Sequence, residues 1–227
     1  MPLLGQGTMT FWNDIEGDAA DFNRWHSFEH MPERVGIPGF RRGRRCAAVA
    51  GGPEYFVMYE TDGAATLTSP AYLERLNNPT PWTSRNQRRF RNSNRTLAAV
   101  SASFGHGVGA AQMTILLAPE AGRETALRRH LHATLGGLVG AHAALGAHLL
   151  EADAAASRIE TAEKALRDRP DEVADWVLVI EALEQEALLA CRAGALADAA
   201  LVAAGARAVE NAARYRLLHV LHAEDLA

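Results

Sequence analysis

Cysteine, lysine and long hydrophobic runs are all scarce in this sequence of 227 residues. Its two cysteines, Cys46 and Cys191, are too few and too far apart for a disulfide framework or a zinc site. The longest apolar runs, such as 113–119 and 176–183, fall far short of the roughly 20 residues that a membrane span needs. The first residues also lack the basic segment and long apolar core of a signal peptide. These absences predict a cytoplasmic protein that has no membrane partner.

Charge is modest and unevenly distributed. The net charge is −4, which gives no general attraction to nucleic acid or to an anionic membrane. Residues 1–105 carry 12 basic and 10 acidic side chains, whereas residues 106–227 carry 11 and 17. The arginines between positions 85 and 95 have no interleaved aromatic stripe, so they predict surface ion pairs and no nucleic-acid site.

The predicted elements follow the order strand, helix, strand, strand, helix, strand, and this order occurs twice. In the first half, strands fit 8–14, 40–49, 55–61 and 95–104, with helical segments over 19–31 and 70–92. In the second half, strands fit 112–117, 142–151, 176–183 and 215–221, with helical segments over 120–135 and 184–209. A further helix over 155–169 separates the middle strands of the second half. The repeated order favours an internal duplication.

This pattern predicts an α+β protein made of two tandem ferredoxin-like βαββαβ repeats, residues 1–105 and 106–227. Each repeat is expected to form a four-stranded antiparallel sheet with helices on one face. A sheet must also bury its other apolar face, so the two sheets are expected to face each other. The predicted result is a barrel-like sandwich with a small-molecule pocket between the sheets.

The helix expected near residue 26 carries the strongest chemical signal. At 100° per residue, His26, Glu29 and His30 share one arc of this helix beside an apolar arc. The spacing His-x-x-Glu-His matches that of inverted zinc peptidases, but no third ligand or second ligand helix follows. A histidine near a carboxylate also suits acid–base catalysis without a cofactor. In a third interpretation, these groups are structural and pair with nearby arginines.

A local motif connects this helix with a known family. The run from Trp25 to Arg34, together with the turn before Phe40, resembles the first helix and turn of EthD-like proteins in the dimeric α+β barrel superfamily. The residues that match the family pattern are His30, Pro32, Pro38 and Gly39.

The resemblance implies two facing sheets and a ligand pocket in each half. Relatives include cofactor-free cyclases, decarboxylases, isomerases and monooxygenases that act on small molecules, and distant members bind haem. By this resemblance His30 is the candidate catalytic residue that handles a proton, with His26 or Glu29 orienting it. The second half lacks the motif, so residues 106–227 are expected to be mainly structural.

Four further side chains are candidate substrate-binding residues: Trp12, Arg44, Glu60 and Trp82. The two tryptophans suit the wall of a pocket mouth, although core packing is equally compatible with them. Arg44 suits an anionic group of the substrate or an ion pair with Glu60. Solvated strand positions are the simpler alternative for both charged residues.

The function expected from these features is a cofactor-independent lyase or isomerase that transfers protons on a small organic substrate. A non-catalytic ligand-binding or structural protein is the first alternative, and a haem- or metal-dependent enzyme is the second. No metal ligand set is predicted. Members of the superfamily often associate, and the alanine-rich second half is a candidate interface for a homodimer.

Overall fold

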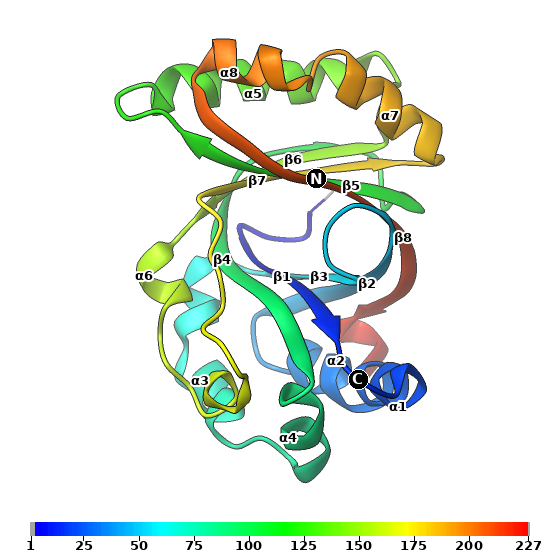
Figure 1. The fold of residues 1–227 in the computed structure, drawn as a ribbon, viewed down its shortest axis with the longest axis vertical. Coiled ribbons are helices and arrows are strands. Elements are labelled where there is room, and N and C mark those ends of the chain that lie inside the picture. The colour runs from blue at the N-terminus through cyan, green and yellow to red at the C-terminus, as the bar shows by residue number, and fades with distance from the viewer. Residues whose placement is uncertain (1–2, 227) are drawn as a thin grey trace.

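Eight antiparallel strands form the centre of the molecule in the computed structural model, which describes residues 3–226 (Figure 1). Their bounds in chain order are β1 Gly7–Ile15, β2 Phe40–Ala50, β3 Tyr55–Thr61, β4 Phe90–Gly105, β5 Ala111–Pro119, β6 Gly146–Ala152, β7 Trp176–Ala182 and β8 Ala206–His222. The strands pair in the order β1-β3-β2-β8-β5-β7-β6-β4, and β4 pairs back with β1. The sheet is therefore a closed barrel, in which every strand has two neighbours.

The expectation of two tandem ferredoxin-like repeats with facing sheets is wrong. Strand β4 pairs with β1 through residues 90–99 and with β6 through residues 98–105. Strand β8 likewise pairs with β5 and then, through residues 214–222, with β2. With 16 and 17 residues, β4 and β8 are long enough to bond to a partner in each half. Closure pairs the backbone groups that two separate sheets would leave open at their edges.

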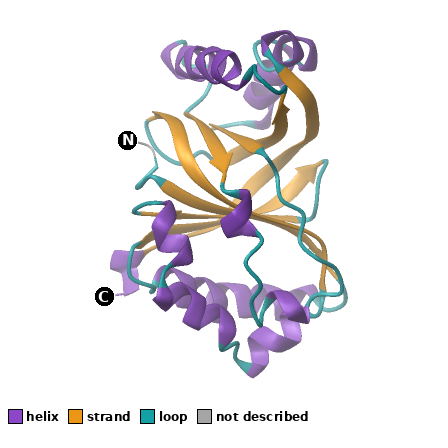
Figure 2. Cartoon of the chain, turned by 90° about the vertical axis from the view of Figure 1, so that its left-hand side faces the viewer, coloured by secondary structure: helices purple, strands orange, loops and turns teal. Residues whose placement is uncertain are grey.

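Helices cover two opposite sides of this barrel (Figures 1 and 2). The helices of the first side are α1 Ala19–Trp25, η1 His26–His30, α2 Met31–Val35, η2 Ala64–Thr68, α3 Pro70–Asn77 and α4 Pro81–Gln87. Those of the second side are α5 Glu124–Gly140, α7 Gln185–Ala193 and α8 Asp198–Ala204. After β8, the described chain ends in a 3₁₀ turn, η4, which spans Ala223–Leu226. Within the described residues, no single helix is long and apolar enough to cross a membrane, and α7 and α8 reach that length and composition only as a pair bent by 51°.

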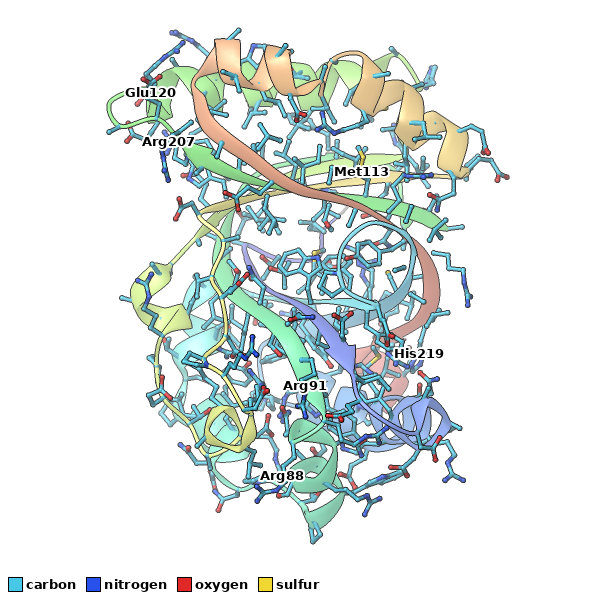
Figure 3. All side chains as sticks on the ribbon, viewed as in Figure 1. Arg88, Arg91, Met113, Glu120, Arg207 and His219 are labelled. Carbon is cyan, nitrogen blue, oxygen red and sulfur yellow. The ribbon has the colours of Figure 1, made fainter. Side chains whose placement is uncertain are left out.

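Three buried clusters hold these layers together. One lies inside the barrel and includes Trp12, Phe56 and Tyr215. The other two lie between the barrel and its helices, one on each side. Met113, which is labelled in Figure 3, belongs to the cluster beneath α5. The same view shows side chains filling the space that the strands enclose.

Residues 153–175 connect β6 to β7 by a long route, and we call this segment the strap. It leaves the second half, passes the side of the barrel and reaches the helices of the first half (Figure 1). Only α6 Ala154–Ser157 and the 3₁₀ turn η3 Lys164–Leu166 are helical, so the helix predicted over 155–169 is wrong for most of its length.

Backbone hydrogen bonds tie the strap to the first half at three places. Asp153 N donates to Leu97 O at 2.8 Å, Glu163 N to Leu76 O at 3.1 Å, and Glu172 N to Ser93 O at 2.8 Å. These bonds replace the internal hydrogen bonds that a helix would have made. The strap thus brings side chains of the second half to the helices of the first.

Candidate active site

A small cavity lies between the outer face of the first-half strands, their helices and the strap. Its volume is about 30 Å³, which is room for about two water molecules. Strands β1, β3 and β4, the helical segments η1, α2, α3 and α4, and the strap all contribute to its lining. The polar residues that line it are Asn13, His26, His30, Arg34, Tyr59, Tyr72, Gln87, Arg95, Thr161, Glu163, Lys164 and Arg167.

The histidine segment is a π-helical turn between two α-helices. The Asp18 carboxylate caps the start of α1 by accepting hydrogen bonds from the backbone of residues 20 and 21. Further along, Pro32 has no N–H and its ring clashes with the carbonyl four residues earlier in a regular α-helix. The chain instead widens over residues 26–30, where Met31 N donates to His26 O, and such turns are frequent at functional sites.

This turn places His26 and His30 together on the wall of the cavity. Their ring centroids lie 5.4 Å apart, and the Trp25 indole packs on the His30 ring at 4.4 Å. The indole N–H of Trp25 donates to Thr83 Oγ1 at 3.1 Å, which fixes the indole plane. The Nδ1 atoms of both histidines are buried and have no hydrogen-bond partner among the described residues.

Both histidines are uncharged at neutral pH. Burial lowers the pKa of His30 well below its ordinary value of 6.5, and the nearby Arg34 guanidinium lowers it further. Burial likewise lowers the pKa of His26, with Arg45 as the next cause. Each ring therefore keeps one nitrogen able to accept a proton. An uncharged imidazole that lines a cavity can act as a general base.

Arginine side chains and aromatic rings form the rest of the wall. Arg34 and Glu163 are 1% and 2% exposed and form an ion pair, and Gln87 Nε2 donates to the other oxygen of Glu163 at 3.2 Å. The Arg167 guanidinium lies over the ring of Phe11, with its central carbon 4.9 Å from the ring centroid. Burial raises the pKa of Tyr59, whose hydroxyl has no partner within residues 3–226 and remains a free donor.

Glu29 is placed apart from the two histidines. Its carboxylate accepts hydrogen bonds from Thr80 Oγ1 at 2.5 Å and Thr83 Oγ1 at 3.1 Å, so it ties the histidine segment to α4. The regular helix assumed from the sequence placed all three side chains on one arc, and the π turn changes this relation. Glu29 is therefore not available to orient His30 directly.

The four candidate substrate-binding residues also lie outside this cavity. Trp12 faces the barrel interior, where its indole N–H donates to Thr114 Oγ1 at 3.3 Å, and it lines a separate hollow of about 360 Å³. Trp82 packs at the edge of the first-half core and donates to Asp21 Oδ1 at 3.2 Å. Arg44 and Glu60 are buried inside the barrel and form an ion pair at 3.0 Å.

A network of ion pairs surrounds Arg44 inside the barrel. Arg44 Nη1 lies 2.6 Å from Glu181 Oε1, and His148 Nε2 lies 3.0 Å from the same oxygen. Despite its burial, Glu181 has its pKa lowered to about 2, since Arg44 and His148 favour the charged carboxylate. This part of the barrel interior is thus occupied by mutually paired charges, and the histidine cavity lies on the other face of the strands.

Sequence reasoning missed Arg34, Arg95 and the strap residues Glu163 and Arg167. Arg34 follows His30 by four positions, so helical spacing pointed toward it. Nothing local indicated the other three, because they reach the cavity from distant segments of the chain. The composition of the strap even favoured a helix that would have kept its charges in solvent.

Comparisons with known proteins define the fold. No family model and no curated protein matches the sequence. Among solved structures, an anthrone oxidase-like protein has a TM-score of 0.66 and 12% identity over 98% of this chain and 95% of its own. A provisionally named monooxygenase from Fusobacterium nucleatum has a TM-score of 0.63 and 6% identity over 97% and 96%. This chain has the dimeric α+β barrel fold.

A more distant neighbour shares the same barrel. A mutant chlorite dismutase from Candidatus Nitrospira defluvii has a TM-score of 0.52 and 9% identity over 98% of this chain and 94% of its own. At these identities the similarity shows the fold alone. The EthD-like branch of the dimeric α+β barrel superfamily, suggested by the sequence motif, stays a prediction.

The histidine cavity does not have room for a haem group. A haem is far larger than the cavity beside His26 and His30, whose walls are packed side chains. The equivalent space on the second side is filled by buried residues such as Leu131, Leu135 and Leu178. As the described side chains stand, neither of these two spaces fits a haem. The described residues also contain no group of three or more histidine, cysteine, aspartate or glutamate side chains that could hold a metal ion.

Proposed function

We propose that this protein is a small-molecule oxidase or monooxygenase in which His30 removes a proton from an aromatic substrate. The observation that carries this proposal is the pair of buried, uncharged histidines in a cavity that guanidinium groups also line. An uncharged imidazole accepts the proton, and the imidazolium that forms balances the charge of the anion that remains. The names of the structural neighbours favour oxygen chemistry over the lyase or isomerase reaction expected from the sequence.

The proposed reaction can be written for a methylene group between two aromatic rings, as in anthrone. His30 takes one proton from this carbon, and the electron pair delocalises onto the carbonyl oxygen as an enolate. Dioxygen then adds to the carbon, and return of the proton gives a hydroperoxide. Loss of water leaves a C=O group. One oxygen atom enters the product and the other leaves as water, so dioxygen is the only oxidant.

His26 is proposed to assist His30 and not to replace it. The two rings are close enough for a proton to pass between them through one water molecule, and Trp25 holds the plane of His30. We also propose that residues 1–105 carry the reacting groups. Residues 106–227 then complete the barrel and supply the strap.

Substrate entry requires movement of the strap. The cavity has room for about two water molecules, so an aromatic molecule fits only after side chains such as Glu163 and Arg167 move away. Closure over the bound substrate would exclude water, which otherwise returns a proton to the carbanion before dioxygen reacts.

Oxygen consumption tests the proposal directly. Purified protein is mixed with anthrone in an oxygen-electrode cell, and anthraquinone is quantified after subtraction of the uncatalysed reaction. We expect one dioxygen per anthraquinone, and we expect His30→Gln to lower kcat at least about 100-fold, the usual loss for a general base. His130→Gln changes an exposed histidine on α5 and serves as the matched control. Equal rates in His30→Gln and wild type would contradict the proposal.

Deuterium exchange separates this function from its alternatives. Without oxygen, the wild-type protein in D₂O should exchange the methylene hydrogens of anthrone, because proton removal does not need dioxygen. Exchange without oxygen consumption in air would favour the lyase or isomerase. Absence of both, together with binding of anthrone, would favour a non-catalytic ligand-binding protein.

A further inference from the structure

The charges that line the cavity do not balance, and the excess resides on one residue. Arg34 pairs with Glu163, Arg167 with Asp171, and Lys164 with Glu160. Arg95 is only 4% exposed, yet no carboxylate of residues 3–226 lies within ion-pair distance of it. Its one side-chain hydrogen bond goes from Nη2 to the hydroxyl of Tyr72 at 3.0 Å.

A second donor points to the same shortage of negative charge. Arg34 Nη1 is buried and has no hydrogen-bond partner among the described residues, because Glu163 engages Nη2 alone. Tyr72, which accepts from Arg95, also lies close enough to Arg34 to influence its charge. Both guanidinium groups line the same cavity.

Comparison with the other buried arginines shows that Arg95 is unusual. Arg42 and Arg44 both pair with Glu60 inside the barrel. Arg45 has no carboxylate partner either, but its guanidinium donates to Asn23 Oδ1 at 2.7 Å and lies over the Tyr55 ring, outside the cavity lining. Arg95 alone among the five combines burial, exposure to the cavity and absence of a counter-charge within residues 3–226.

A buried charge without a partner costs several kcal/mol of folding free energy. A ligand anion can supply the missing partner, and arginine is suited to grip a planar oxyanion through two parallel N–H bonds. We infer that the substrate carries a single carboxylate, which binds Arg95 and the free Nη1 of Arg34. This inference rests on the proposed function for the identity of the site and adds the class of substrate.

The charge balance also limits the ligand to one negative charge. Glu163 already neutralises Arg34, so the cavity holds one uncompensated positive charge. A second carboxylate would lie near Glu163 without a cation to balance it. The ring walls of Phe11 and Phe90 meanwhile select a flat aromatic body. The substrate class is therefore an aromatic monocarboxylate.

Calorimetric titration with three naphthalene probes tests this inference. The probes are 2-naphthoate, its neutral analogue 2-naphthamide and the dianion naphthalene-2,6-dicarboxylate. We expect 2-naphthoate to bind at least about tenfold more tightly than either of the others, which corresponds to charge-assisted hydrogen bonds. Titration of 2-naphthol above and below the pKa of its hydroxyl shows whether a phenolate can replace the carboxylate. Equal binding of naphthoate and naphthamide, or no binding of naphthoate at millimolar concentration, would overturn the inference.

Variants of Arg95 identify the residue responsible. Arg95→Met should weaken 2-naphthoate about tenfold or more and leave 2-naphthamide unchanged, whereas Arg85→Met removes an exposed charge of the same half and should change neither. Arg95→Lys keeps the positive charge and loses the paired N–H donors of the guanidinium, so it should weaken naphthoate binding by a smaller factor. If Arg95→Met does not fold, Arg95→Lys provides the test. Naphthoate binding equal to wild type in both variants would overturn the inference.

The outcomes of the two sets of experiments separate the two claims. Loss of anthrone turnover in His30→Gln without any preference for naphthoate would leave the proposed function standing and remove the substrate class. Preference for naphthoate that depends on Arg95, without oxygen consumption or deuterium exchange, would support the ligand class and remove the proposed function.

Discussion

The two buried histidines make a quantitative prediction about stability and pH. In the unfolded chain each imidazole titrates near its ordinary pKa of 6.5, whereas in the folded protein burial and nearby arginines keep His26 and His30 uncharged well below that pH. As pH falls below 6.5, the unfolded state takes up protons that the folded state does not. The free energy of unfolding therefore decreases as pH falls, and the decrease stops only near the folded-state pKa.

The size of this effect follows from proton linkage. Between pH 7 and pH 5.5, one histidine that is charged only in the unfolded state lowers stability by about 1.3 kcal/mol. The pair therefore lowers it by about 2.5 kcal/mol over that interval. Other groups, such as His148 and the buried carboxylates, add their own pH dependence, so the pair must be isolated by difference.

Urea unfolding of matched variants provides that difference. The free energy of unfolding is measured at pH 7.0, 6.5, 6.0 and 5.5 for the wild type, for the double variant His26→Gln/His30→Gln and for a control. The control, His130→Gln/His132→Gln, removes two exposed histidines from α5. We expect the wild type and the control to lose about 2.5 kcal/mol more than the cavity double variant between the two extremes.

Two results would refute this reasoning. If the cavity double variant loses as much stability as the wild type, His26 and His30 titrate alike in the folded and unfolded states. If the wild type loses less stability than the cavity double variant, His26 and His30 are charged in the folded protein, and His30 is then unsuited to act as a base. The same argument places the acid limb of kcat/KM well below pH 6.5, because the base form of His30 persists there.

Two further predictions concern the strap and the second half. Glu163→Gln leaves Arg34 buried without a counter-charge and should lower the free energy of unfolding in urea by about 3–5 kcal/mol. The double replacement Arg34→Met/Glu163→Met should restore most of this loss. Equal stability of the single variant and wild type would show that the pair is not buried in solution. Leu131→Ala opens a cavity beneath α5 and should lower the free energy of unfolding by about 2–5 kcal/mol. The affinity for 2-naphthoate should not change, because Leu131 is on the side of the barrel away from the site. A matching loss of affinity would mean that the two sides are coupled.

Strand positions could be predicted from the sequence because they depend on local pattern. The strands expected at 8–14, 55–61 and 176–183 correspond to β1, β3 and β7 within one residue at each end. Both faces of β3 and β7 are buried, which is why apolar and aromatic residues run without interruption over 55–59 and 176–180. Their pairing could not be predicted in the same way. The pairs β2–β8 and β4–β6 join segments far apart in the chain, and no local pattern specifies which edges meet.

For the site too, features that depend on local spacing could be predicted, and features that depend on distant segments could not. His26 and His30 were identifiable because their spacing along one helix brings them together. For Arg44, the sequence left open an anionic group of the substrate and an ion pair with Glu60. In the structure Arg44 pairs with Glu60 and with Glu181 across the barrel, and the second of these pairs depends on closure of the sheet. A charged strand residue shows its function only once its partner across the barrel is known.

The strap gives two halves of similar element order different layers between strands and helices. In the described part of the second half, buried leucines such as Leu131 and Leu135 pack between the strands and the helices. In the first half, the same space is lined by histidines and arginines, whose burial needs compensating charge. That charge is carried by Glu163, which belongs to the second half and reaches the site only because the strap crosses the barrel. In the proposed site Glu163 balances Arg34 and leaves Arg95 for a ligand, so we expect the strap to determine the charge of the ligand that the cavity binds.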